Sequence, residues 1–190
     1  MTDVERAEAQ QLFVGDEREL IIDKFDIPIT RGKLKCLEPG LWPNDEVINF
    51  HMKMLQERNA SGNAYAQSWF CSTFFFRKLT NEQADGRREY TYKNVMRWTK
   101  RAQVDVFAEE FVFVLVHVNK IHLVMGAVNM ELKQVCYYDS MSASAGQIAF
   151  FGETMLRWVK DEHQNKKGAP LPDEKNVEGC SSSARSSAEK

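Results

Sequence analysis

The clearest pattern of apolar and polar positions lies in the middle of the chain. The stretch "EFVFVLVHV", residues 110–118, is a continuous apolar and β-branched run with the length of a buried strand. Two further runs, "HLVMGAVNM" at 122–130 and "KQVCYYDSM" at 133–141, follow after short polar connections. Short strands joined by short connections are typical of antiparallel pairing. The pattern therefore predicts an antiparallel meander over residues 111–139.

Helical periodicity occurs on both sides of this meander. Asn44 suits a helix N-cap, and the acidic residues Asp45 and Glu46 would lie in the first turn, where the helix dipole favours negative charge. Apolar residues then recur at helical spacing, which predicts a helix over about 45–58. A similar spacing predicts a second helix over about 146–162.

The remaining segments give shorter elements. "IPIT" at 27–30 predicts a strand and "RGKLKCL" at 31–37 a helical turn. The aromatic stretch Tyr65–Leu79 predicts a buried strand or the wall of a groove, and 95–107 a short helix entering the next strand. Residues 1–20 form a charged lead-in that we expect to be partly disordered. Residues 169–190 carry serine clusters and few bulky apolar side chains, which predicts a disordered tail.

Composition narrows the class of protein. A chain of 190 residues with 43% hydrophobic and 27% charged residues fits one globular domain. A net charge of -2 gives no electrostatic case for binding nucleic acid or an anionic membrane. The polar N-terminus is unlike a secretory signal, and no apolar run approaches the ~20 residues of a membrane span, so we expect an intracellular protein. The cysteines form no C-x-x-C pair, which argues against a zinc ribbon or a disulfide framework.

A histidine and an aspartate stand at the ends of two of the predicted strands. A turn at Asn129–Leu132 would place His122 directly opposite Asp139, with Cβ atoms ~4.5–5.5 Å apart. The carboxylate could then fix one imidazole tautomer and leave the other nitrogen as a base, or the pair could be purely structural. A register slip of one residue would put the two side chains on opposite faces. A metal site that adds His117 lacks a fourth ligand at usable spacing, so we expect no metal and no cofactor.

Several sequence blocks favour a catalytic role for the His122–Asp139 pair, because they occur together over about residues 25–168 and in the order of one protein family. They are "ITRGKLKCL", "LWPNDEVINFHMKML", "CSTFFF", "MRWTKRAQVDVF", "VLVHVNKIHLVMGAVNMELKQVCYYDSM" and "MLRWVKDEHQNKKG". With these blocks the sequence resembles the ubiquitin-like-protein-specific cysteine proteases of the Ulp1/SENP family, which process SUMO precursors and remove SUMO from conjugates. The resemblance implies an α+β, papain-like fold with a small, mostly antiparallel central sheet flanked by helices. It also implies that residues 21–168 form the protease domain.

The resemblance also implies roles for single residues. His122 would be the general base and Asp139 the acid that orients it. Trp42 would line the tunnel around the Gly-Gly end of the substrate. The residue after the histidine, which usually is a tryptophan that closes this tunnel, is Leu123 here. The surface that receives the ubiquitin-like partner would include Asp45, Arg97 and Trp98. Because the family is intracellular and often nuclear, we expect a nuclear monomer with SUMO or a related modifier as its partner.

This sequence differs from the family at the position of the nucleophile. The family places it after the aspartate, in a pattern like Q-x-N-x-x-D-C-G that opens a buried helix, whose N-terminus lowers the thiol pKa. Only Cys180 follows Asp139, with Glu174 at the position of the glutamine, and "SSSARSSAEK" after it has no apolar face. Cys71 and Cys136 are expected to be buried packing thiols. We therefore expect the C-terminal part of the fold, with the cysteine, to be missing from this copy. The alternatives are an active SUMO-specific peptidase, an inactive ubiquitin-like-binding protein and a non-functional fragment.

Overall fold

The computed structural model describes residues 2–62, 65–118, 122–141 and 143–172, and the backbone of 178–183. The chain divides into two compact units, residues 1–57 and 58–190. The first unit contains α1 (Asp3–Gln11), β1 (Leu20–Lys24), β2 (Ile27–Thr30), α2 (Arg31–Leu34), η1 (Lys35–Leu37) and most of α3 (Asp45–Ala60). The second contains β3 (Ser68–Phe70), α4 (Phe74–Leu79), η2 (Tyr92–Asn94), α5 (Trp98–Ala102), β4 (Phe111–Val118), β5 (His122–Asn129), β6 (Gln134–Asp139), α6 (Ala145–Lys167) and β7 (Glu178–Ser183).

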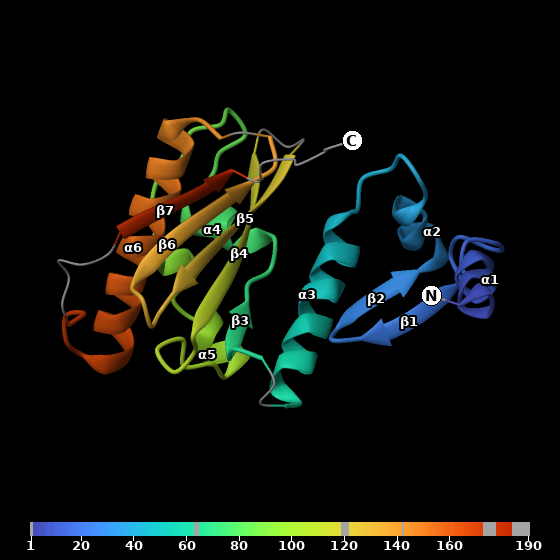
Figure 1. The fold of residues 1–190 in the computed structure, drawn as a ribbon, viewed down its shortest axis with the longest axis horizontal. Coiled ribbons are helices and arrows are strands. Elements are labelled where there is room, and N and C mark those ends of the chain that lie inside the picture. The colour runs from blue at the N-terminus through green and yellow to red at the C-terminus, as the bar shows by residue number, and fades with distance from the viewer. Residues whose placement is uncertain (1, 63–64, 119–121, 142, 173–177, 184–190) are drawn as a thin grey trace, which may run out of the picture. The chain divides into compact units, whose positions relative to one another are not determined.

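In the first unit a hairpin of β1 and β2 packs on α3 (Figure 1). Its turn residues Phe25 and Asp26 both have positive φ, 61° and 57°, as the tight turns that match strand twist require. The Phe25 ring lies 5.4 Å from that of Phe50 in α3, and Lys24 pairs with Glu57 at 2.7 Å. These contacts hold an aromatic residue in a backbone conformation that usually favours glycine.

A buried arginine ties α1 to the hairpin. Arg31 donates to the carboxylate of Glu19 at 2.7 and 3.1 Å and to the carbonyl oxygens of Gln11 and Leu12 at 2.8 and 2.7 Å. The last carbonyls of a helix have no partner within the helix itself. Arg31 therefore satisfies the C-terminal end of α1 while its own charge is paired.

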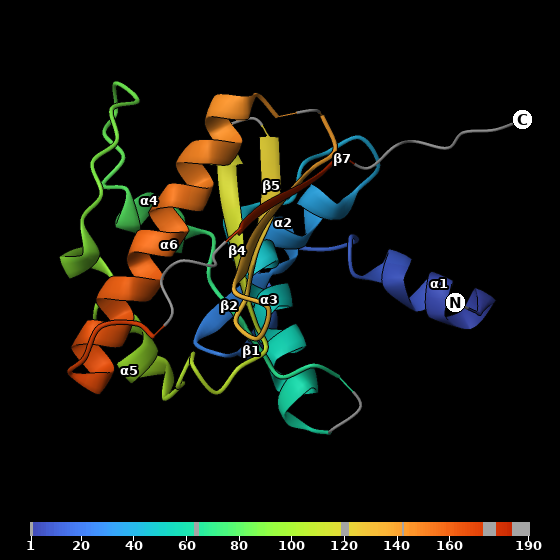
Figure 2. The ribbon, with the colours of Figure 1, turned by 60° about the vertical axis from the view of Figure 1, so that its left-hand side comes forward.

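The second unit is built on a sheet with strand order β3-β4-β5-β6-β7. The predicted meander is confirmed, because β4, β5 and β6 pair antiparallel. The two outer pairings, β3 with β4 and β6 with β7, are parallel, so the described sheet is mixed. Figures 1 and 2 show α4 and α6 on one face of this sheet. The core between them consists of apolar side chains from these helices and from the strands, including Phe75, Phe151, Trp158, Val114 and Val124.

Helix α6 confirms the second predicted helix and extends it to Lys167. Ser144 and Gln147 form a capping box, in which each side chain accepts a backbone N–H of the other residue. Gly168, at φ 69°, ends the helix in the left-handed conformation. The helix approaches the sheet closely at Gly126, where an added Cβ would lie within 2.7 Å of ring atoms of Phe151. Only a residue without a side chain fits there.

The first predicted helix is confirmed as α3. Asn44 acts as its cap, because its side-chain oxygen accepts the N–H of Val47 at 2.9 Å. The strand at 27–30 and the helical turn at 31–37 are also confirmed as β2, α2 and η1.

Two expectations differ from the structure. The aromatic stretch Tyr65–Leu79 is not one strand: it forms the short strand β3 and then α4, whose buried side chains Phe75, Phe76 and Leu79 follow helical spacing. Residues 178–183, expected within a disordered tail, have backbone that pairs with β6 as strand β7. Backbone pairing needs no apolar side chain, which is why the side-chain pattern did not predict this strand.

Candidate active site

His122 begins β5 and Asp139 ends β6, and their side chains meet on the face of the sheet that α6 covers. Nε2 of His122 lies 2.6 Å from Oδ1 of Asp139. The side chains are 14% and 8% exposed, so little water competes for this contact. The aspartate bond takes Nε2 of the imidazole and leaves Nδ1 as the nitrogen that can exchange a proton with another group.

The predicted register was wrong by two residues. Asn129 pairs with Gln134, not with Leu132, because residues 130–133 all lie in the turn. The Asn129 side chain accepts the N–H of Leu132 at 2.7 Å, and Lys133 closes the turn at φ 53°. His122 and Asp139 are therefore diagonal neighbours and not direct ones. A shift of two residues keeps both side chains on one face, so the predicted contact forms despite the different register.

The carboxylate of Asp139 has a second donor. The backbone N–H of Met141 donates to Oδ1 at 2.7 Å, a bond that aspartate commonly makes two residues ahead in a turn. Burial raises the pKa of Asp139, but the hydrogen bonds from Met141 and His122 outweigh it and leave the pKa below its usual value. The carboxylate is therefore charged at neutral pH.

The negative charge is also felt by its neighbour on β6. Burial, and then the charge of Asp139, raise the pKa of Tyr137, while Arg88 lowers it in part. Tyr137 is buried and packs on Phe151 with ring centroids 5.3 Å apart. This phenol therefore stays neutral at neutral pH.

If His122 acts as a base, its nucleophile must come within about 3 Å of the imidazole. Met125 pairs with Tyr138 and Cys180 pairs with Cys136, so His122 lies five residues further along the sheet than Cys180. At a rise of roughly 3.3 Å per residue, this is about 16 Å. The backbone of β7 thus carries Cys180 away from the base, and its side chain lies outside the described residues, as does Glu174.

The other thiols of the second unit are buried. Cys71 is 1% exposed, and burial raises its pKa well above the usual value. Cys136 is also buried and shares a face with Tyr138, whereas Asp139 points to the other face. Both were predicted to be packing thiols, and the burial of both is confirmed.

His117 does not join the pair. It pairs with Leu123 in the β4–β5 ladder, whereas His122 pairs with Val118, so the two imidazoles belong to opposite faces of the sheet. Among the residues that the structure describes, no group of three histidine, cysteine or acidic side chains is arranged to hold a metal ion.

The remaining predicted site residues are distributed over both units. In the first unit Trp42 is 76% exposed in the loop before α3, and Asp45 is the first residue of that helix. In the second unit Leu123 is half-buried in β5. Arg97 is exposed immediately before α5, whereas Trp98 is half-buried and packs edge-on against Phe75 at 5.7 Å. Trp98 therefore packs against the core, and only part of it is exposed at the surface.

One contributor to the pair escaped the sequence analysis. The backbone N–H of Met141 lowers the pKa of Asp139, as the hydrogen bond to His122 does. Because it is a backbone group, no side chain marks it in the sequence. The signal that could have found it is the "DSM" that ends the strand, because aspartate at the start of a turn accepts the N–H two residues on.

An α+β core with a histidine–aspartate pair at the end of its sheet defines a domain of the papain-like cysteine protease class. Residues 41–181 match the model of the Ulp1 protease family, C-terminal catalytic domain. The chain belongs to this family. As for the membrane, no helix in the described part of the chain has the length and apolarity to span one.

Sequence relatives agree with this assignment. Human sentrin-specific protease 2 is 33% identical over 169 residues, which are 89% of this chain and 26% of that protein. Ubiquitin-like-specific protease 1A of Arabidopsis thaliana is 33% identical over 171 residues, 88% of this chain and 32% of that protein. The chain thus spans about a quarter to a third of the length of these relatives.

Solved structures show the same fold. The C-terminal Ulp1 protease domain in complex with Smt3, the yeast ortholog of SUMO, superposes with a TM-score of 0.77 at 20% identity, over 96% of this chain and 75% of that one. The SUMO protease Ulp1 with its catalytic cysteine oxidized to a sulfinic acid gives a TM-score of 0.76, also at 20% identity.

Proposed function

We propose that the chain is a SUMO-specific cysteine peptidase domain that processes precursors and removes SUMO from conjugates at the C-terminal Gly-Gly. The observation that carries this proposal is the His122–Asp139 pair at 2.6 Å inside a domain of the Ulp1 protease family. His122 acts as the base through Nδ1, and Asp139 holds the ring and stabilises its protonated form. The reaction takes place inside the cell, in the nucleus, as the family resemblance implies.

The family resemblance assigns substrate contacts to single residues. Trp42 would line the tunnel for the Gly-Gly end, and exclusion of larger side chains would give specificity. Leu123 would take the position at which the family usually has a tryptophan. Asp45, Arg97 and Trp98 would contact the folded body of the modifier. Leucine covers the diglycine less tightly than the usual tryptophan. We therefore expect Leu123→Trp to lower the Kd for a Gly-Gly-ended modifier, and not for one shortened by these two residues.

A second candidate function is binding without cleavage. It is favoured by the register of β7, which carries the backbone of Cys180 about 16 Å along the sheet from His122. In that case the chain would recognise the modifier and its conjugates but would form no thioester with them.

A SUMO probe with a C-terminal electrophile separates these functions. Covalent labelling that is lost in Cys180→Ser and reduced in His122→Ala supports the peptidase. Capture of the probe without a covalent bond, lost in Trp42→Ala, supports binding alone. A chain that neither labels nor captures the probe, although it unfolds cooperatively, contradicts both functions. Asp139→Asn tests the proposed partner of the base, because it keeps the shape of the side chain and removes its charge.

A further inference from the structure

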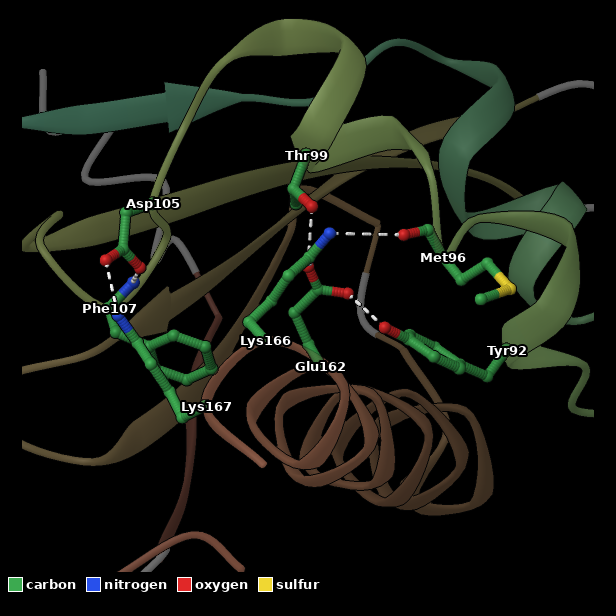
Figure 3. Close-up of polar contacts among 8 residues, drawn as sticks. All are labelled: Tyr92, Met96, Thr99, Asp105, Phe107, Glu162, Lys166 and Lys167. Atoms are coloured by element: carbon green, nitrogen blue, oxygen red, sulfur yellow. Dashed lines mark hydrogen bonds and ion pairs between the residues drawn. The ribbon is translucent and has the colours of Figure 1, made fainter. Parts of the chain in front are cut away.

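A buried carboxylate far from the His122–Asp139 pair lies under the segment that carries Arg97. Glu162 of α6 has no exposed surface, although a lone charge in a core is costly. Its Oε1 accepts the hydroxyl of Thr99 at 2.5 Å, and its Oε2 accepts the hydroxyl of Tyr92 at 2.6 Å (Figure 3). Lys166, one turn further along α6, pairs with it at 3.6 Å. The charge is thus fully partnered.

Both hydroxyl partners of Glu162, Tyr92 and Thr99, belong to one segment. This is residues 92–102, here called the Arg97 segment, which contains η2 and α5. Lys166 adds a third tie, because its ammonium donates to the carbonyl of Met96 at 3.4 Å (Figure 3). The three ties therefore fall at residues 92, 96 and 99, and Arg97 lies between two of them.

The Arg97 segment needs such ties. Helix α5 has only five residues, and an isolated helix of that length is unstable in water. Lys93, Arg97, Lys100 and Arg101 are all exposed, and the segment contains no acidic residue, so its charges repel one another. Glu162 places one negative charge beneath them.

Protonation also favours the arrangement. Burial, and then the hydrogen bond to Glu162, raise the pKa of Tyr92 far above its usual value, so its hydroxyl is protonated and can donate at neutral pH. Thr99 is 2% exposed, so its hydroxyl has no competing water. Both bonds are of the charge-assisted kind, which is stronger than a bond between neutral groups.

We infer that Glu162 is a positioning residue that holds the Arg97 segment in the shape that receives the ubiquitin-like modifier. This inference rests on the proposed function and deepens it, since it identifies what sets the recognition surface. Glu162 touches no substrate itself, and its effect on binding passes through Arg97.

The test compares Glu162→Gln with Asp161→Asn in the full chain. Both changes replace a carboxylate of α6 by its amide, and both affect a 2.6 Å bond from a tyrosine hydroxyl, because Asp161 accepts Tyr90. Only Glu162 holds residues that flank Arg97. Hydrogen exchange is followed at amides whose bonds depend on the segment, such as Arg101 to Arg97 and Val104 to Thr99.

The expected result has two parts. In Glu162→Gln these amides exchange roughly tenfold faster, and the Kd for SUMO ending in Gly-Gly rises roughly fivefold (about 1 kcal/mol), while Asp161→Asn changes neither. Arg97→Ala weakens binding in the wild-type background and adds nothing in the Glu162→Gln background, because the same contact has already been lost.

Three results would overturn the inference. Exchange that is unchanged, or equally fast in Asp161→Asn, shows that Glu162 does not position the segment. Faster exchange with an unchanged Kd shows that the position does not serve binding. A wild-type chain that does not bind SUMO refutes the proposed function itself, and the inference with it. Should Glu162→Gln not fold, Thr99→Val and Tyr92→Phe each remove one tie and must give the same pattern at smaller size.

Discussion

Replacement of Gly126 by alanine tests how closely α6 must approach the sheet that carries the His122–Asp139 pair. The added Cβ would lie 2.6 and 2.7 Å from two ring carbons of Phe151 and closer still to the ring tip. The ring cannot turn away freely, because it is 1% exposed and lies 5.3 Å from the rings of Phe76 and Tyr137. The clash must therefore be relieved by displacement of α6 or of β5.

The magnitude follows from this geometry. Overpacking a well-packed core costs about 1–3 kcal/mol, and a contact this short against an immobile ring belongs at the upper end, about 3 kcal/mol. For a chain of this size, 1 kcal/mol corresponds to roughly 2–4 °C in Tm, so the Tm should fall by roughly 6–12 °C. Thermal and urea unfolding followed by circular dichroism would measure both quantities.

Two further variants make the reasoning refutable. Gly152→Ala adds the same methyl group to α6, at the residue after Phe151, where the new Cβ meets nothing within 4 Å. It should raise stability by about 0.5–1 kcal/mol, because alanine favours helix. In a Phe151→Ala background, Gly126→Ala should lower the free energy of unfolding by at least ~1 kcal/mol less than it does in the wild type, because the ring that the new methyl group meets is absent. Additive costs, or a Gly126→Ala chain as stable as wild type, would refute the account.

Two other predictions concern the pair and the helix. Asp139→Asn should remove a stabilisation that is present above the usual pKa of 3.8 and is lost as the pH falls through the lower folded-state pKa. Urea unfolding from about pH 7 to about pH 2 should show the gap between wild type and variant closing below that value, and a gap independent of pH would contradict the assignment. Ser144→Ala should cost about 1 kcal/mol of unfolding free energy, because it removes the capping box of α6. The exposed Ser140→Ala is its control and should stay within ~0.5 kcal/mol of wild type, and equal losses would count against the cap.

Features decided by local pattern were predictable from the sequence. The strands of the meander follow from continuous β-branched runs, and α3 and α6 follow from helical spacing. Asn44 marks the start of α3 through its own side-chain hydrogen bond. The contact of His122 with Asp139 was also predictable, because it needs only that both side chains fall on one face.

Features decided by single backbone angles or by distant partners were not predictable. The turn at 130–133 is longer than expected because Lys133 adopts a positive φ, which lysine does not signal in sequence. Glu162 reads as a solvent-exposed helix residue until Tyr92 and Thr99, more than sixty positions away, are folded over it. Arg31 likewise looks like a surface charge until the end of α1 is packed on it.

The register of β7 limits where a nucleophile for His122 can come from. Parallel pairing with β6 places Ser183, not Cys180, at the level of Asp139. Moving Cys180 even to the level of Asp139, two residues short of His122, requires a shift of three residues. That shift would break every present backbone bond between the two strands and reverse the faces of β7. As long as β7 keeps this register, a thiol that serves His122 must come from a segment other than β7. Labelling at Cys180 by an electrophilic SUMO probe would therefore require that β7 leaves the sheet, and hydrogen exchange of the β6 amides would show whether it does.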